Sequence, residues 1–183
     1  MAIAPTGLTY DDLQKMPDDG RRYELIGGEI VVSPSPGLAH QELVLRLTLL
    51  LHGFVDPGKL GRVILAPFDV RLSEGDVVQP DILFVSAARL EILRENHTLG
   101  APDLVVEVAS PSVRSRDDGE KLALYAAAGV REYWLADPAA KEFRALSLDA
   151  DRYRLIGQVG FTVRSAVLSG LEIDRASLFS DLP

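Results

Sequence analysis

The chain contains the apolar run Val77-Val78-Gln79-Pro80-Asp81-Ile82-Leu83-Phe84-Val85 and, after it, the run Pro102-Asp103-Leu104-Val105-Val106-Glu107-Val108-Ala109. Both runs are rich in Val, Ile and Leu and are bounded by Pro, which predicts buried strands. Asp81 and Glu107 interrupt these strands. Because burial of an unpaired carboxylate is costly, such acids are usually paired or bound to metal. We therefore expect the chemistry of this protein at these two acids.

Composition predicts a soluble globular protein. The 183 residues are 47% hydrophobic and 25% charged, and they contain no Cys. This length fits one domain, which we assign to residues 1–183. The lack of Cys excludes disulfides and thiolate ligands and is consistent with a cytoplasmic location. The net charge of −8 argues against non-specific binding of nucleic acid by the whole surface, but it allows a local basic groove.

Several classes of function lack their sequence signals. The N-terminus has no basic, apolar leader, and the most apolar stretch, residues 43–55, is broken by polar residues, so we expect no membrane association. Gly27-Gly28 lacks the Gly-x-Gly-x-x-Gly context and no Walker sequence is present, which disfavours a nucleotide cofactor. A serine-hydrolase Gly-x-Ser-x-Gly elbow is also missing.

Local patterns predict a mixture of hairpins and helices, hence an α/β or α+β mixed sheet. Gly27-Gly28 reads as a two-residue hairpin turn, and Thr9 to Asp12 reads as a capping box with Asp in place of Glu. Helices are expected from Thr9 to Met16, from about Gly37 to Gly53, from Ala87 to Glu95 and from Ser115 to Ala128. Further strands are expected at 62–72, 77–86, 104–109, 132–136, 143–148 and 153–159.

The helix that ends near Gly53 is apolar on two faces. Leu43, Leu47 and Leu51 recur at helical spacing, while Leu45 and Leu49 form a second face. Such a helix is deeply buried or packs against a partner chain. We expect a homodimer.

The spacing of the two acids leaves room for a short helix and a return strand between them. Asp81 and Glu107 then face each other on neighbouring strands, with the backbone carbonyl of Val108 as a further oxygen ligand. Carboxylates favour Mg²⁺ or Mn²⁺, whereas a three-histidine zinc site would require every His of the chain. The alternative is that both acids face solvent at strand ends.

Lys121 is the cation that we expect near these acids. It lies in the helix after the strand of Glu107, and Tyr125 shares its face at i+4. A lysine there stabilises charge near an attacking water or a scissile phosphate. The alternative is a surface ion pair between Asp117 and Lys121, worth only about 0.3–0.5 kcal/mol.

These motifs resemble those of the PD-(D/E)xK nuclease superfamily. The matching residues are Pro80-Asp81, Glu107-Val108-Ala109 and the helix residues Asp117, Lys121 and Tyr125. More narrowly, the chain is similar to a large bacterial family of restriction-endonuclease-like proteins (Uma-two type). The segments that carry this similarity are Tyr23-Glu24-Leu25-Ile26-Gly27-Gly28-Glu29, Glu107 to Ser112 and Gly129 to Pro138.

The resemblance implies a restriction-endonuclease-like fold, in which a mixed β-sheet is flanked by helices and followed by a C-terminal antiparallel meander. Ala109 stands where the superfamily usually has Lys, and the resemblance implies that the lysine has moved to the following helix, at Lys121. Glu24 matches the N-terminal acid of the narrower family, which makes it a candidate third acid. A polar residue on the outer face of the hairpin is the alternative for Glu24.

Three further residues are weaker candidates for substrate binding. His40, at the start of the long helix, is placed to contact phosphate or assist proton transfer. Arg114 and Arg116 flank the same edge and are candidate phosphate ligands. An ordinary helix-start histidine and exposed loop arginines are the alternatives.

The sequence thus predicts a Mg²⁺- or Mn²⁺-dependent endonuclease that hydrolyses DNA phosphodiester bonds, with Asp81 and Glu107 as metal ligands and Lys121 as catalytic cation. A catalytically inactive nuclease-fold protein that binds nucleic acid or mediates assembly is the main alternative. An enzyme that uses the same acids on another substrate is a third, because fold does not dictate function.

Overall fold

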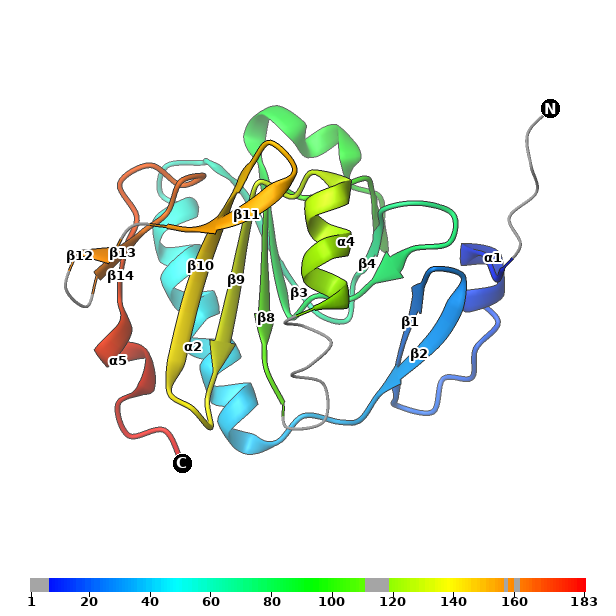
Figure 1. Ribbon diagram of the computed structural model, residues 1–183, viewed down its shortest axis with the longest axis horizontal. Helices are drawn as coiled ribbons and strands as arrows, with labels where there is room; N and C mark the ends of the chain where they lie inside the picture. The colour runs from blue at the N-terminus through cyan, green and yellow to red at the C-terminus, as the bar shows by residue number, and fades with distance from the viewer. Residues whose placement is uncertain (1–6, 111–118, 157, 160–161) are drawn as a thin grey trace.

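The computed structural model describes residues 7–110, 119–156, 158–159 and 162–183. Its centre is a six-stranded mixed sheet with the strand order β11-β10-β9-β8-β6-β3 (Figure 1). These strands are β3 (Gly61–Leu65), β6 (Ile82–Ser86), β8 (Leu104–Val108), β9 (Glu132–Asp137), β10 (Glu142–Asp149) and β11 (Arg152–Leu155). Within this sheet β8 and β9 run parallel, and the other neighbours run antiparallel. A parallel pair needs a crossover connection, and α4 (Glu120–Ala128) lies in it.

Helices cover both faces of this sheet (Figure 1). On one face, α2 (Leu38–Val55) buries Leu43, Leu47 and Leu51 against alternate strand residues such as Val106. On the other face, α4 packs Tyr125 against the strand side chains that alternate with those on the α2 face. Since successive side chains of a strand point to opposite faces, Glu107 shares the α4 side of β8. α4 ends at Ala128, as predicted, and Gly129 follows it with a φ of 83°, while Ser115, the predicted first residue of this helix, lies outside the described residues.

A second, five-stranded sheet lies beside the central one, in the order β2-β1-β5-β4-β7. Its strands are β1 (Arg22–Ile26), β2 (Glu29–Ser33), β4 (Asp69–Arg71), β5 (Val77–Val78) and β7 (His97–Leu99). The predicted Gly27-Gly28 hairpin is confirmed: Ile26 pairs with Glu29, and the two glycines have φ values of 59° and 78°. The capping box is confirmed as well, since the Asp12 carboxylate accepts hydrogen bonds from the Thr9 amide and hydroxyl at the start of α1 (Tyr10–Leu13).

Two predicted strands were wrong in extent, because each is divided between the two sheets. The segment 62–72 forms β3 and β4, which are separated by the cis peptide Ala66-Pro67. The segment 77–86 forms β5 and β6, which are separated by Gln79-Pro80-Asp81. Proline has no amide hydrogen for a sheet ladder, so the strands end at these points. Asp81 therefore precedes β6 instead of lying within it.

The C-terminal region forms a smaller layer on the α2 side. It contains the antiparallel strands β12 (Gln158–Val159), β13 (Thr162–Arg164) and β14 (Glu172–Asp174), followed by α5 (Arg175–Phe179). The predicted strand 153–159 is divided between β11 and β12, and the predicted helix 87–95 is the shorter 3₁₀ helix η1 (Ala87–Ile92).

In the portion of the chain that the structure describes, no helix combines the length and hydropathy needed to span a membrane. The α+β fold, with mixed sheets flanked by helices and C-terminal antiparallel strands, is as predicted.

Candidate functional site

The two acids meet at one end of the central sheet. In the antiparallel pair of β6 and β8, Ile82 lies opposite Val106. Continuing this register by one residue sets Asp81 opposite Glu107. Both side chains are almost fully buried, and both line one small pocket with about 30 Å³ of free space. That space is sufficient for one or two molecules the size of water.

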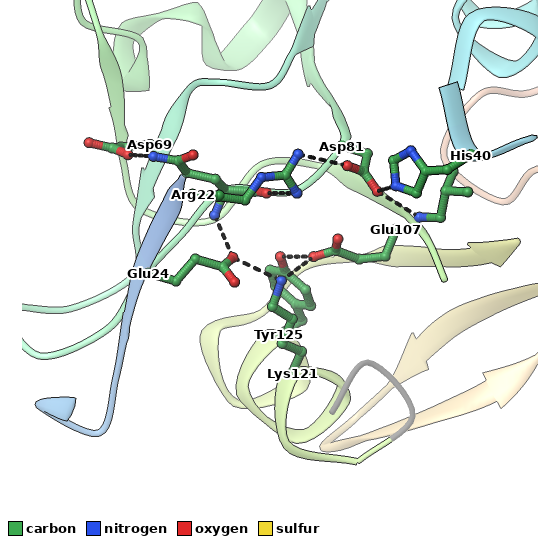
Figure 2. A network of polar contacts seen from close by, with 10 residues as sticks. Arg22, Glu24, His40, Asp69, Asp81, Glu107, Lys121 and Tyr125 are labelled. Carbon is green, nitrogen blue, oxygen red and sulfur yellow. Dashed lines mark hydrogen bonds and ion pairs between the residues drawn. The ribbon is translucent and has the colours of Figure 1, made fainter. Parts of the chain in front are cut away.

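Asp81 is held by groups from three elements (Figure 2). Its Oδ2 accepts a hydrogen bond from the Val108 amide at 2.8 Å and lies 3.2 Å from His40 Nε2. Its Oδ1 accepts a hydrogen bond from Arg22 Nη2 at 3.0 Å. Burial opposes ionisation of this carboxyl, but the His40 hydrogen bond and the Arg22 charge outweigh it and hold the pKa of Asp81 below its ordinary value of 3.8. Asp81 is therefore ionised at neutral pH.

Lys121 bridges two buried acids from different sheets (Figure 2). Its Nζ lies 3.1 Å from Glu107 Oε1 in the central sheet and 2.8 Å from Glu24 Oε1 in β1. Each of the three side chains is at most 5% exposed. Lys121 is the second residue of α4, and its side chain lines the same pocket as Asp81 and Glu107.

Tyr125 completes the surroundings of Glu107. Its hydroxyl donates a hydrogen bond of 2.8 Å to Glu107 Oε1, the same oxygen that Lys121 contacts. Burial, followed by the charges of Glu107 and Glu24, raises the pKa of Tyr125 well above its ordinary value. The hydroxyl therefore remains protonated and acts as a donor.

Glu24 and Arg22 share one face of β1, because they are two residues apart. Glu24 Oε1 also accepts a hydrogen bond from the Gln79 amide at 2.8 Å, and Arg22 Nη1 donates to the Gln79 carbonyl at 3.1 Å. Glu24 Oε2 is buried and has no hydrogen-bond partner among the residues that the structure describes. The outer face of the hairpin, the alternative for Glu24, is thereby excluded, since its side chain is 1% exposed.

The donor set fits a hard divalent cation. Asp81, directly before β6, and Glu107, on the adjacent strand β8, supply two carboxylates, and Val108 lines the same pocket. Mg²⁺ usually keeps several of its waters and binds through one or two carboxylates, so this pair is sufficient. Over the described ranges, no group of three or more His, Cys, Asp or Glu is arranged to hold an ion. A metal ion at this site would therefore depend on two acids. In this structure Asp81 contacts Arg22 and His40, and Glu107 contacts Lys121 and Tyr125.

The structure brings together six of the eight predicted site residues. Those six are Asp81, Glu107, Lys121, Glu24, His40 and Val108. Arg114 and Arg116 lie outside the described residues. Arg22 and the hydroxyl of Tyr125 are further groups of the site that the sequence patterns did not predict. Alternation on β1 offered a signal for Arg22, because a strand that turns Glu24 inward turns Arg22 inward too.

A mixed central sheet with two acids at one end and a lysine from the flanking helix defines the restriction-endonuclease-like class. The model of the Uma2 family, described as "Putative restriction endonuclease", matches residues 10–176, and the chain belongs to this family. The structure is similar to a crystal structure from Anabaena variabilis whose title describes "a putative nuclease belonging to DUF820". That match has a TM-score of 0.81 and 22% identity and covers 96% of this chain and 99% of the other, which shows a common fold. No curated protein matches the chain.

Proposed function

We propose that this protein is a metal-dependent nuclease that hydrolyses phosphodiester bonds of DNA. The observation that carries the proposal is that Asp81, directly before β6, and Glu107, on the adjacent strand β8, line one pocket that Lys121 lines as well. The family and the fold are nuclease-like, which supports the same reading. The cations of this site are consistent with a phosphodiester substrate, because phosphodiester cleavage develops negative charge that cations must offset.

Asp81 and Glu107 would hold Mg²⁺ or Mn²⁺, with the carbonyl of Val108 as a further oxygen ligand. When bound, such an ion activates water and neutralises charge on the phosphate. Lys121 orients the attacking water or stabilises the developing charge, and Glu24 fixes the position of the ammonium by its contact of 2.8 Å. His40 contacts Asp81 and lines the pocket, so it is placed to relay a proton at Nε2.

A cleavage assay tests the proposal. Wild type, Asp81→Asn and Glu107→Gln are incubated with plasmid DNA, single-stranded DNA and RNA in Mn²⁺, in Mg²⁺ and in chelator. We expect cleavage of DNA by wild type in the presence of metal and its loss in both variants. Asp149→Asn, which changes an exposed acid on β10 that pairs with Arg154, serves as the matched control. Undiminished cleavage by both site variants would remove the mechanism.

A non-catalytic module that binds nucleic acid or mediates assembly is the second candidate. The observation that favours it is that protein groups already contact both acids, since Lys121 lies between Glu24 and Glu107 and Arg22 pairs with Asp81. A buried ionic network of this kind can persist for structural reasons alone. Calorimetric titration with Mn²⁺ separates the two candidates, because a nuclease site binds the ion in a way that depends on Asp81.

A further inference from the structure

Arg22 lies at the boundary between the acid pocket and a neighbouring groove. Its guanidinium is held at two points, by Asp81 Oδ1 through Nη2 and by the Gln79 carbonyl through Nη1 (Figure 2). The side chain is 25% exposed, so part of it remains accessible to a ligand. A guanidinium carries five N–H donors in a rigid fork that suits phosphate, and the two hydrogen bonds of Arg22 leave donors on the fork for one.

The neighbouring groove has the size of a ligand site. It contains about 350 Å³ and shares Arg22, Pro34 and Pro36 with the acid pocket. Volumes of about 300–1,000 Å³ are typical of pockets that enclose a small organic ligand. Gln41 and Gln79 also line the groove, so polar residues contribute to its lining. A chain of nucleotides that enters the acid pocket through this groove passes Arg22.

The two oxygens of Asp81 differ in their partners. Oδ2 accepts the Val108 amide at 2.8 Å, a backbone contact that the strand fixes, and it also lies next to His40. Among the described residues, Oδ1 contacts one side chain, Arg22, in an ion pair that is monodentate. Oδ1 is therefore the oxygen that a cation can reach by displacing a single flexible group.

The formal charges of the network favour joint binding of cation and phosphate. Among the residues that the structure describes, and with His40 counted as neutral, Glu24, Asp81 and Glu107 bring three formal negative charges and Arg22 and Lys121 bring two formal positive charges, so the sum of these five is −1. A divalent cation alone makes the sum positive, and a phosphodiester alone makes it more negative. The two together bring the sum of these five charges to zero. In a buried environment, where charges interact strongly, this favours binding of both over binding of either.

We propose that Arg22 is a phosphate-binding residue that exchanges Asp81 for a substrate phosphate, so that Asp81 Oδ1 becomes fully available to a divalent cation when nucleic acid is bound. This inference rests on the proposed function and adds to it a way in which substrate regulates metal binding. In the free protein Arg22 neutralises Asp81 and weakens metal binding. The arriving phosphate draws the guanidinium away and strengthens metal binding, which restricts the loaded site to complexes with substrate.

Titration of the full-length chain with Mn²⁺ tests the exchange. The titration is made without nucleic acid and with a short single-stranded oligodeoxynucleotide whose phosphorothioate linkages resist hydrolysis. An oligonucleotide with uncharged methylphosphonate linkages is the negative control for the ligand. The variants are Arg22→Gln, which removes the charge, and Arg22→Lys, which keeps it. Arg154→Gln is the control variant, because Arg154 forms an exposed ion pair with Asp149 at the edge of the sheet.

In wild type we expect the phosphorothioate oligonucleotide to tighten Mn²⁺ binding by about tenfold, a usual size for coupling between sites. Arg22→Gln binds Mn²⁺ without oligonucleotide about tenfold more tightly than wild type, and the oligonucleotide then changes this affinity by less than about twofold. Its affinity for the oligonucleotide itself decreases. Arg22→Lys retains part of the coupling because it keeps a point charge, and Arg154→Gln behaves as wild type.

An Arg22→Gln variant with the Mn²⁺ affinity and the coupling of wild type overturns the exchange. If wild type nevertheless cleaves DNA in an Asp81-dependent manner, the proposed function stands and only the role of Arg22 is wrong. Absence of Mn²⁺ binding in both wild type and Arg22→Gln overturns the two together. A variant that does not fold is recognised by circular dichroism, and Arg22→Lys then decides the question through the size of its coupling.

Discussion

The ammonium of Lys121 lies 3.1 Å from Glu107 Oε1, although the lysine belongs to α4 and the acid to β8. The contact joins a helix that follows the strand to the strand itself. In this way the fold supplies a cation to Glu107 without a lysine on the strand, where the position two residues later holds the buried Ala109. The same ammonium contacts Glu24, so one lysine connects the two sheets.

Removal of the Lys121 charge is expected to destabilise the protein as well as stop turnover. Lys121→Met leaves Glu24 and Glu107 buried without this cation, and breaking a buried pair on one side typically costs about 3–5 kcal/mol of unfolding free energy. Urea denaturation of Lys121→Met, Glu24→Gln and the double variant measures the coupling. We expect the double variant to be more stable than the sum of the single losses predicts. Strictly additive losses would contradict the contact.

Tyr125 is expected to position Glu107 for metal binding. Tyr125→Phe removes the hydroxyl that donates to Glu107 Oε1, at a cost of about 2 kcal/mol in stability, the usual size for a hydrogen bond to a charged group. The concentration of Mn²⁺ needed for half-maximal cleavage should increase several-fold, while kcat at saturating Mn²⁺ changes little. The control is Tyr153→Phe, whose hydroxyl donates to the Val130 carbonyl away from the acids. A decrease of kcat with no change in the Mn²⁺ requirement argues against a positioning role.

Much of this site was predictable because its residues break strong local patterns. A single acid in an otherwise apolar strand marked Asp81 and Glu107, and helical spacing placed Lys121 on the face of α4 that meets the sheet. The Gly27-Gly28 turn followed from the need for positive φ at both positions. These features depend on residues close in sequence, which is why periodicity reveals them.

The remainder depends on contacts between distant segments. An apolar run does not indicate which of two sheets it joins, so the division at Pro67 and at Pro80 was missed even though proline inside a strand is a warning. Strands β13 and β14 have three residues each. This layer is attached to the central sheet by Glu132, whose carboxylate accepts hydrogen bonds from the Ser165 hydroxyl and the Val167 amide. Nothing local in either segment predicts that contact.

Stability is expected to decrease in acid partly because of Asp103. This buried carboxylate accepts hydrogen bonds from the Ser86 amide at 2.7 Å and from Arg89 at 2.8 Å, and it also contacts Arg131. Burial opposes its ionisation, but the Ser86 and Arg89 contacts outweigh burial and lower the pKa of Asp103 below 3.8. A lowered pKa in the folded state stabilises the protein above the ordinary pKa. This stabilisation is lost as the pH falls through the lowered value.

Urea denaturation of Asp103→Asn over a range of pH measures this effect. At neutral pH the variant should lose about 2 kcal/mol, the usual size for hydrogen bonds to a charged group. Its stability should also decrease less steeply than that of wild type below a pH of about 4. Some slope remains, because the pKa of Asp81 is lowered too. Identical slopes in wild type and Asp103→Asn are the result that contradicts the assignment.

The exposed face of α2 leads us to expect a homodimer. Leu38, Leu45 and Leu49 are 68%, 57% and 64% exposed, and their spacing places them in one stripe along the helix. Apolar stripes of this kind tend to be covered by a partner, and a two-fold axis sets the same stripe of two copies against each other. Sedimentation velocity should show a dimer for wild type. The double variant Leu45→Glu and Leu49→Glu should be monomeric, because it places like charges in the contact.

Leu155→Glu provides the control for this experiment, since Leu155 is 56% exposed on the edge strand β11 and lies outside the stripe. It should remain dimeric. Asp81 and Glu107, the proposed metal ligands, lie at the end of the central sheet and not on the exposed face of α2, so the monomeric double variant should still bind Mn²⁺. A wild type that sediments as a monomer at every concentration contradicts the dimer and leaves the metal site unaffected.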